Sequence, residues 1–212
     1  MNARIWAGVR ERVRALPYGD SLAEPLTAEE LGELEAQIGV ALPDEYRGFL
    51  RHVGAGGAGI FLVRRVDGSW LWEGDGAALT ELSRLAEPFP RTGPHAERLA
   101  ALVEAWPEES DHADGEAYEA AYDAWAEEWE PLLWSADRTP GAVVIAHLGC
   151  ALREWLIVSG PERGRIWSDD RADGVDLAPL LDDKGEPATF ARWYLDWLEQ
   201  AEHEASLRGD DA

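Results

Sequence analysis

The sequence predicts an α+β domain in which helices pack against an antiparallel sheet. Apolar residues recur at helical spacing near both ends of the chain. Between these ends lie three apolar runs separated by turn residues, at 142–147, 151–158 and 164–168, which predict a three-stranded antiparallel meander. Consecutive strands with helices set apart from them are typical of the α+β class. With 46% hydrophobic residues in 212, the chain has enough apolar material for one sizeable core, and we expect a single domain.

The N-terminal part is predicted to be mainly helical. Residues 4–16 carry apolar side chains at helical spacing and end at Pro17, so we expect a short amphipathic helix there. Thr27 and Glu30 form a capping box that starts a second helix. A third helix begins beside Pro43, where the missing backbone N–H would have had no partner in any case.

A glycine-rich run and two short strands follow these helices. The run 54–59 contains four glycines and is predicted to reverse the chain. It follows a helix and lacks the lysine of a phosphate-binding loop, so nucleotide binding is not indicated. We expect strands at 60–63 and 70–72, joined across a turn at 66–68.

The middle of the chain is strongly acidic. A helix is predicted over 93–106, and no Lys or Arg occurs between Arg98 and Arg138. Aromatic residues nevertheless recur in this region at steps of three or four: Tyr118, Tyr122, Trp125 and Trp129. This spacing favours an acidic amphipathic helix over a disordered segment, and we interpret 107–131 as an insertion on the basic fold.

A C-terminal helix is predicted over 188–207. Its bulky residues are expected to face the core together: Phe190, Trp193, Tyr194, Trp197 and Leu198. The predicted organisation is an N-terminal helix and linker at 1–26, one domain at 27–207 that contains the acidic insertion, and a short polar tail at 208–212.

The formal net charge of −23, from 42 acidic and 19 basic residues, restricts the possible partners. Binding to nucleic acid or to an anionic membrane surface is electrostatically unfavourable, so we expect a basic protein as the partner. The sequence leaves the oligomeric state open.

Several features favour a bacterial, cytoplasmic protein. The single cysteine, Cys150, excludes an intramolecular disulfide framework and favours a reducing compartment. Residues 1–17 lack the apolar core of a signal peptide, and no 18-residue apolar run predicts a membrane span. Eighteen of the 19 basic residues are arginine, which indicates GC-rich coding.

No arrangement of reactive residues predicts an enzyme. The loop residues Asp169, Asp170 and Asp173 lack the spacing of a calcium loop, and we interpret them as a solvated turn. The five histidines show no zinc-binding pair. Cys150 lies near His147 without a third group to position it, so we expect a buried structural thiol. No catalytic residue, metal or cofactor is expected.

Three segments, in this order, carry a family resemblance. They are Leu31-x-x-Leu34-x-x-x-Ile38-Gly39-Val40-x-Leu42-Pro43-x-x-Tyr46-x-x-Phe49-Leu50; His147-Leu148-Gly149-Cys150 with Trp155-Leu156-Ile157-Val158-Ser159-Gly160-Pro161-Glu162-x-Gly164-x-Ile166-Trp167-x-Asp169; and Phe190-x-x-Trp193-Tyr194-x-x-Trp197-Leu198. Together they frame most of residues 27–200, and in this the chain resembles the SUKH superfamily (Smi/Knr-type domain). The helix at 4–16 and the acidic region make it longer than the shorter members of that superfamily.

The resemblance implies a SUKH-like fold and a non-catalytic, protein-binding role. Its bacterial members imply an immunity protein that neutralises a cognate toxin, often a nuclease. Its fungal members, regulators of cell-wall synthesis, imply an intracellular regulatory or scaffold protein that binds cellular partners. Acidity favours the first role because nucleases have cationic clefts, and both roles stay open at this point.

The residues expected to bind the partner fall into two groups. Acidic side chains supply the field: Glu108, Glu109, Asp111, Asp114, Glu116, Glu119, Asp123, Glu127, Glu128 and Glu130. Aromatic anchors are expected either at Trp125 and Trp129 or, beside the glycine-rich run, at Trp70 and Trp72. Packing in the core is the favoured alternative for most of the eleven tryptophans, above all for Trp155, Trp167, Trp193 and Trp197.

Overall fold

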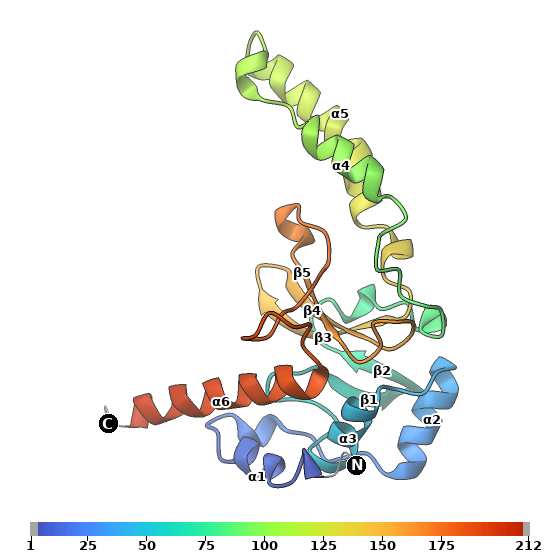
Figure 1. Ribbon diagram of the computed structural model, residues 1–212, viewed down its shortest axis with the longest axis vertical. Coiled ribbons are helices and arrows are strands. Elements are labelled where there is room, and N and C mark those ends of the chain that lie inside the picture. The colour runs from blue at the N-terminus through green and yellow to red at the C-terminus, as the bar shows by residue number, and fades with distance from the viewer. Residues whose placement is uncertain (1–3, 210–212) are drawn as a thin grey trace.

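The computed structural model describes residues 4–209 and shows an α+β arrangement in this part of the chain (Figure 1). Six α-helices and two antiparallel sheets confirm the predicted fold class. The helices are α1 (Val9–Arg14), α2 (Ala28–Ile38), α3 (Asp44–His52), α4 (Ala96–Glu104), α5 (Gly115–Leu133) and α6 (Phe190–Gly209). The strands are β1 (Leu62–Val66), β2 (Ser69–Glu73), β3 (Ala142–Gly149), β4 (Leu152–Ile157), β5 (Ile166–Asp169) and β6 (Ala178–Pro179).

The larger sheet has the strand order β3-β4-β5-β6, and every neighbouring pair is antiparallel. β3, β4 and β5 are the predicted meander, in which Trp155 pairs with Trp167. Val143, Ile157 and Ile166 are fully buried, because other elements cover both faces of the sheet. Burial on both faces explains why these strands are almost continuously apolar in sequence.

The smaller sheet is a hairpin of β1 and β2 in which Val63 pairs with Trp72. Asp67 and Gly68 form its turn with positive φ angles of 48° and 85°. Two left-handed central residues give a turn whose twist suits antiparallel strands. The predicted pair of strands is confirmed, with β1 starting two residues later than expected.

Aromatic side chains from α3, α6 and the segment before α1 meet in the main core. The ring centroids of Phe49 lie 4.6 Å from Tyr194, 5.5 Å from Phe190 and 5.6 Å from Trp6, all in edge-on geometry. Such pairs stabilise a core beyond the area they bury. α1 is shorter than predicted because the chain forms turns before Val9, with Gly8 at φ 74°.

α6 faces the core with a narrower stripe than predicted. Phe190, Tyr194 and Leu198 are fully buried, whereas Trp193 and Trp197 are half-buried at the border of the core. The prediction that both tryptophans pack against the core is confirmed, but they are not fully buried, because the five bulky residues span more of the helix circumference than its neighbours cover. α6 also continues to Gly209, so the expected tail begins in helix, and residues 210–212 lie outside the described range.

α4 and α5 form an antiparallel helical hairpin that projects from the body on the side away from α1 and α6 (Figure 1). The acidic helix predicted within 107–131 is therefore present, and the carboxylate of Asp114 caps it by accepting from the backbone N–H of Ala117 at 2.9 Å. The hairpin has a small core of its own, separate from the main core: Leu99, Leu102, Trp129 and Leu133.

A buried ion pair fixes the end of α5 to the larger sheet. Asp169 on β5 is completely buried, and Arg171, in the short 3-10 helix η7 (Arg171–Asp173), is 4% exposed. The guanidinium donates to the Asp169 carboxylate through Nε and Nη2, both at 2.8 Å, and to the carbonyl of Leu133 through Nη1 at 3.2 Å. The indole N–H of Trp155 also donates to Asp169, at 2.8 Å.

The ionic state of Asp169 follows from these contacts. Burial alone would raise its pKa, but the hydrogen bonds and the charge of Arg171 hold the pKa below its ordinary value. The solvated turn predicted at 169–173 is wrong at Asp169 and Arg171, because a charge this deeply buried needs a partner.

A second buried arginine ties both ends of the hairpin to the body. Arg138, in the 3-10 helix η6 (Ala136–Arg138), donates to the carbonyls of Pro90 at 2.9 Å and Leu177 at 3.3 Å, and it pairs with Asp176 at 2.9 Å. Pro90 precedes α4 and Arg138 follows α5, so a single side chain joins the two stems of the hairpin.

Glu154 on β4 is a buried carboxyl without an ion pair among the described residues. It is 5% exposed, and its Oε2 has no hydrogen-bond partner. Burial raises the pKa of Glu154 to about 7, the indole of Trp193 opposes this shift by donating to the carboxyl, and the nearby charge of Asp170 adds to it.

We predict that Asp169→Ala lowers the free energy of unfolding by about 3–5 kcal/mol, because it leaves the Arg171 charge buried without a partner. Denaturant melts followed by circular dichroism measure the loss. Asp183→Ala is the matched control, since Asp183 forms an exposed pair with Arg192 at 3.2 Å. The control should change stability by less than about 0.5 kcal/mol, and an equally small effect at Asp169 would contradict the buried pair.

We predict that Glu154→Gln removes a pH dependence of stability. The folded-state pKa lies above the ordinary value, so between about pH 4.5 and 7 the folded protein binds a proton that the unfolded chain has lost. The contribution of this group to stability therefore falls as the pH rises through that window. At pH 8 the variant should be more stable than the wild type by up to about 3 kcal/mol, and at pH 4 the two should agree. Denaturant melts across this range, with exposed Glu186→Gln as control, test the prediction, and parallel curves at Glu154 would refute it.

Candidate functional site: an acidic aromatic groove on the helical hairpin

The α5 helix separates its aromatic and its acidic residues onto different faces. The aromatic face carries Tyr122, Trp125, Trp129 and, one turn later, Leu133. Acidic residues recur at steps of three or four along a neighbouring stripe: Glu116, Glu119, Asp123, Glu127 and Glu130. At 100° per residue the stripe is rotated from the aromatic face by roughly a third of a turn. We call these five residues the acidic stripe.

A groove opens where the aromatic face of α5 meets the end of α4 and the η7 loop. Its two adjoining cavities have volumes of about 360 Å³ and 230 Å³. The lining residues are Val103, Trp106, Tyr122, Trp125, Trp129, Glu130, Leu133, Trp134 and 171–174, and we call this the hairpin groove.

The indole rings of the hairpin groove pack on one another and stay partly open to solvent. Trp106 meets Trp125 edge-on at 4.6 Å, and Trp125 stacks on Trp129 at 5.0 Å. Trp106 is 47% exposed, and Trp134 is 39% exposed at the other end of the groove. Exposed, contiguous aromatic surface of this kind is typical of protein-binding sites.

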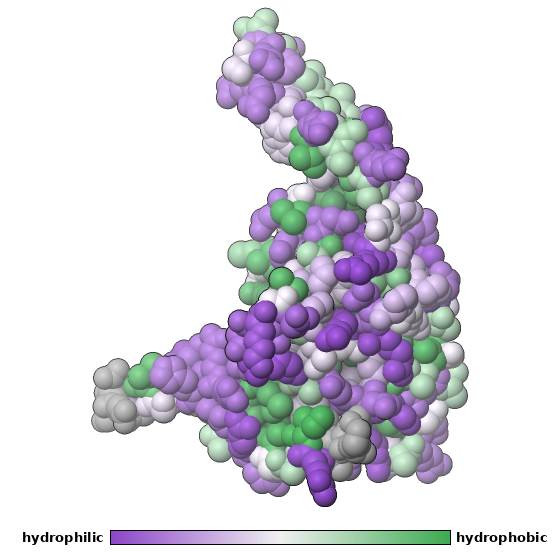
Figure 2. All heavy atoms as spheres, viewed as in Figure 1, coloured by the Kyte–Doolittle hydropathy of each residue, from purple (hydrophilic) through white to green (hydrophobic). Residues whose placement is uncertain are grey.

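The charge around the groove is one-sided. Residues 99–137 contain twelve of the 42 acidic residues and none of the 19 basic ones. Among the described residues, Glu128 pairs with Arg98 and Asp137 with Arg84, and the acidic stripe has no ion pair. Figure 2 shows hydrophilic side chains gathered at the tip of the hairpin.

The structure brings the predicted acidic residues together on the hairpin. Glu108, Glu109, Asp111 and Asp114 lie at its tip, around the 3-10 helix η5 (Glu109–Asp111), and are exposed. Glu116, Glu119, Asp123 and Glu127 belong to the acidic stripe, and Glu128 lies on the opposite flank of α5.

Trp70 and Trp72 do not belong to this site. They are 5% and 4% exposed, and the indole N–H of Trp72 donates to the hydroxyl of Tyr46 at 2.8 Å. Both indoles are packing residues in this conformation, which corrects the expectation of surface anchors at these positions. They are buried because β2 lies against α2, where Gln37 bonds the backbone of Trp70.

Sequence reasoning missed half of the groove. The sequence analysis gave Trp106 and Trp134 no part in binding, and it did not connect Asp173 and Gly174 with α5. No local signal was available for Asp173 and Gly174, because η7 reaches the groove from a part of the chain some forty residues away.

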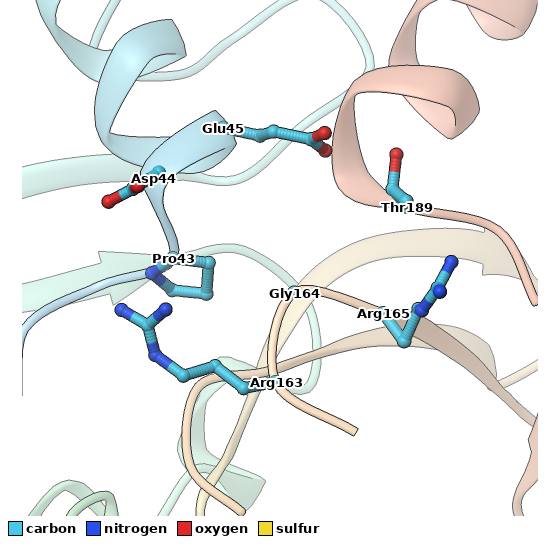
Figure 3. Close-up of a pocket in the computed structure, with 7 residues that line it drawn as sticks. All are labelled: Pro43, Asp44, Glu45, Arg163, Gly164, Arg165 and Thr189. Carbon is cyan, nitrogen blue, oxygen red and sulfur yellow. The ribbon is translucent and has the colours of Figure 1, made fainter. Parts of the chain in front are cut away.

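A second pocket, of about 240 Å³, lies between the start of α3, the β4–β5 turn and the start of α6 (Figure 3). Its polar side chains already have structural partners. Arg163 donates to the carbonyl of Leu42 at 2.7 Å, Arg165 donates to that of Pro187, and Glu45 accepts from the backbone N–H of Ala191 at 2.9 Å. We interpret this pocket as a junction between elements.

The reactive side chains singled out in the sequence form no metal-binding cluster within residues 4–209. In that range, no group of three or more His, Cys, Asp or Glu side chains is placed to hold a metal ion. Cys150 is exposed at the tip of the β3–β4 turn, so the predicted buried thiol is wrong. It is turned outward because Cys150 and Ala151 both adopt positive φ there, at 49° and 63°.

The sequence of the chain matches a model of the SMI1 / KNR4 family (SUKH-1) over residues 25–183, about three quarters of its length. The chain belongs to the SUKH-1 family. This confirms the resemblance, and the match spans the whole helical hairpin. Neither the comparison with curated proteins nor that with solved structures gave a match.

Membership of SUKH-1 fits an immunity or a regulatory role. SUKH proteins bind partner proteins, serve in immunity or regulation and are generally non-catalytic. Within residues 4–209, no helix of this SUKH-1 protein has the length and apolar character needed to cross a membrane.

We predict that Trp129→Ala loosens the hairpin while the body stays folded. Trp129 is 7% exposed in the small hairpin core, which shares no residue with the main core. A protease that cuts after glutamate should then cleave within 99–137 several-fold faster. Trypsin has no site within 99–137, so apart from faster cleavage after Arg98 on α4 it should cleave the chain at the wild-type rate.

Val103→Ala is the control for this experiment, because Val103 is 56% exposed on α4. It should leave both digestion rates unchanged. If Trp129→Ala also accelerated trypsin throughout the chain, the hairpin and the body would form one cooperative unit.

Proposed function

We propose that this SUKH-1 protein is an immunity protein that neutralises a basic toxin domain, and that the helical hairpin is its contact surface. The observation that carries the proposal is the acidic stripe running beside an open aromatic groove. A nuclease toxin is the partner that best suits this surface, because its substrate-binding cleft must be cationic to hold phosphates.

The charge of the hairpin supports fast recognition of such a partner. Unpaired, exposed carboxylates on one side of a projecting element create a field that attracts a basic surface before contact. Electrostatic steering of this kind raises association rates towards about 10⁸–10⁹ M⁻¹s⁻¹ at low salt. The stripe has no competing intramolecular cation among the described residues, so its field is available to a partner.

The groove supports affinity as well as rate. Acidic side chains at a rim are screened beyond about 8 Å at physiological salt, and they contribute little once the complex has formed. A few residues in desolvated pockets contribute most of the binding energy at protein interfaces, and tryptophan is enriched among them. Trp106 and Trp125 are the exposed and half-exposed candidates for this role.

The shape of the hairpin supports insertion into a concave site. α4 and α5 stand away from the body, so their tip and flank can enter a cleft without a clash from the sheet (Figure 1). A regulatory scaffold needs no such complementarity to a cationic cleft. If the experiments below show no binding to the toxin, they favour this regulatory role instead.

Co-expression tests the proposed role. An immunity gene is expected beside the gene of its toxin. The toxin domain encoded there should arrest bacterial growth by itself and should not do so with this protein present. Failure to rescue growth, together with no co-purification of the two proteins, would contradict an immunity role.

We predict that Glu116→Lys, Glu119→Lys and Asp123→Lys together slow association with that toxin domain several-fold and flatten its salt dependence. The reason is that rim charges act mainly through the association rate. Stopped-flow fluorescence at several salt concentrations measures both quantities.

The matched control reverses three exposed acids on the body: Asp20, Glu199 and Glu204. This variant has the same net charge as the hairpin variant, so it separates local steering from the overall field. If both variants slow association equally, the hairpin is not the contact surface.

A further inference from the structure

The 230 Å³ cavity of the hairpin groove is lined by three tryptophans, an aliphatic side chain and one carboxylate. Val103, Trp106, Trp125 and Trp129 come from the hairpin, and Asp173 and Gly174 come from the η7 loop. Its volume is below the about 300–1,000 Å³ of pockets that bind drug-sized ligands. A cavity of this size suits one long side chain.

The indoles of Trp106, Trp125 and Trp129 line this cavity together. The N–H of Trp125 already donates to the carbonyl of Leu102 at 2.8 Å, so the ring of Trp125 has no free donor to offer. Indole faces carry a negative quadrupole that attracts cations, and tryptophan is the strongest aromatic partner for them.

The carboxylates around the cavity have the matching sign. Asp173 is exposed and has no ion pair among the described residues, and Glu130 of the acidic stripe lines the adjoining part of the groove. The single cation below the groove, Arg171, is neutralised by its bidentate pair with Asp169. The cavity therefore favours binding of a positively charged group and disfavours a negatively charged one.

Beside the groove, the protein already holds a guanidinium against both an indole ring and a carboxylate. The guanidinium of Arg171 lies 4.7 Å from the ring centroid of Trp134 while it pairs with the carboxylate of Asp169. An arginine seated in this cavity against the indoles of Trp106 and Trp125, with Asp173 at its head, would repeat that arrangement. Guanidinium is planar and weakly hydrated, so it stacks on indole with less loss of hydration than an ammonium group.

We infer that this cavity is a socket for an arginine side chain of the protein partner. The guanidinium would lie against the indoles of Trp106 and Trp125 that line the cavity, and Asp173 would form its ion pair. A second copy of this chain is a poor occupant because its own acidic stripe would be repelled. The inference rests on the proposed protein-binding role and adds the chemistry of the anchor residue.

The test uses the full chain and a capped pentapeptide with a central arginine flanked by glycine and serine. Titration followed by NMR should shift the indole N–H signals of Trp106 and Trp125 and leave those of Trp70 and Trp72 in place. A pentapeptide with citrulline, the neutral analogue of arginine, should bind at least about threefold more weakly, because cation–π attraction is worth roughly 0.5–2 kcal/mol.

Two variants make the test specific. Asp173→Asn and Trp106→Ala should each weaken arginine-peptide binding by about 3- to 30-fold. Asp20→Asn and Tyr18→Ala, which remove an exposed acid and an exposed aromatic ring on the body, should not. Trp106→Ala removes a ring that packs within the hairpin, so a loss of binding in this variant has two explanations. Asp173 lies on the η7 loop, so Asp173→Asn tests the socket without changing the packing of the hairpin.

Three results would overturn the inference: equal binding of the citrulline peptide, shifts confined to other surfaces, or no effect of Asp173→Asn. If the arginine peptide fails to bind while the charge reversal still slows association with the toxin domain, the socket is wrong and the proposed function stands. If the socket binds arginine but co-expression gives no protection, the proposed function is wrong instead.

Discussion

Asp169 and Arg171 form a buried ion pair at the point where β5, η7 and the end of α5 meet. The pair costs desolvation free energy, and it is retained only because every hydrogen bond around it is made, including those from Trp155 and to Leu133. It fixes the end of α5 against the sheet and also sets the conformation of η7. Both walls of the hairpin groove, the indoles and the Asp173–Gly174 corner, therefore depend on one interaction.

The remainder of the molecule is arranged so that the hairpin can be strongly acidic. The main core holds the sheet, α1, α3 and α6 without any residue of the hairpin, whose own core has four members. Like charges three or four residues apart destabilise a helix by about 0.2–0.5 kcal/mol per pair. Among the described residues, no ion pair offsets this repulsion within the acidic stripe. The charges of the stripe therefore fit a role in binding a partner better than a role in folding.

Local patterns predicted the elements, and long-range packing decided the site. The capping box at Thr27 and Glu30, the strand meander and the amphipathic spacing of Tyr122, Trp125 and Trp129 are properties of neighbouring residues, and each gave the right element. The acidic flank of α5 followed from the same helical periodicity.

The errors share a physical cause. Asp169 looked solvated because the sequence shows Arg171 two residues away but not the contacts with Trp155 and Leu133 that bury the pair. Trp70 and Trp72 looked available because the contacts that bury them come from α2 and α3. Trp193 was expected to be more deeply buried than it is because hydrophobic periodicity gives the apolar side of α6 but not the width that its neighbours cover.

The central claim is that the hairpin groove is the partner-binding surface. Hydrogen exchange of the full chain with and without the cognate toxin domain tests it most directly, because exchange reports on every segment without assuming any of them. The account predicts slower exchange in 96–134 and 171–175 on binding, with β1, β2 and α6 unchanged. Protection confined to the pocket between α3 and α6, or to the β3–β4 turn, with the hairpin unchanged, would contradict it.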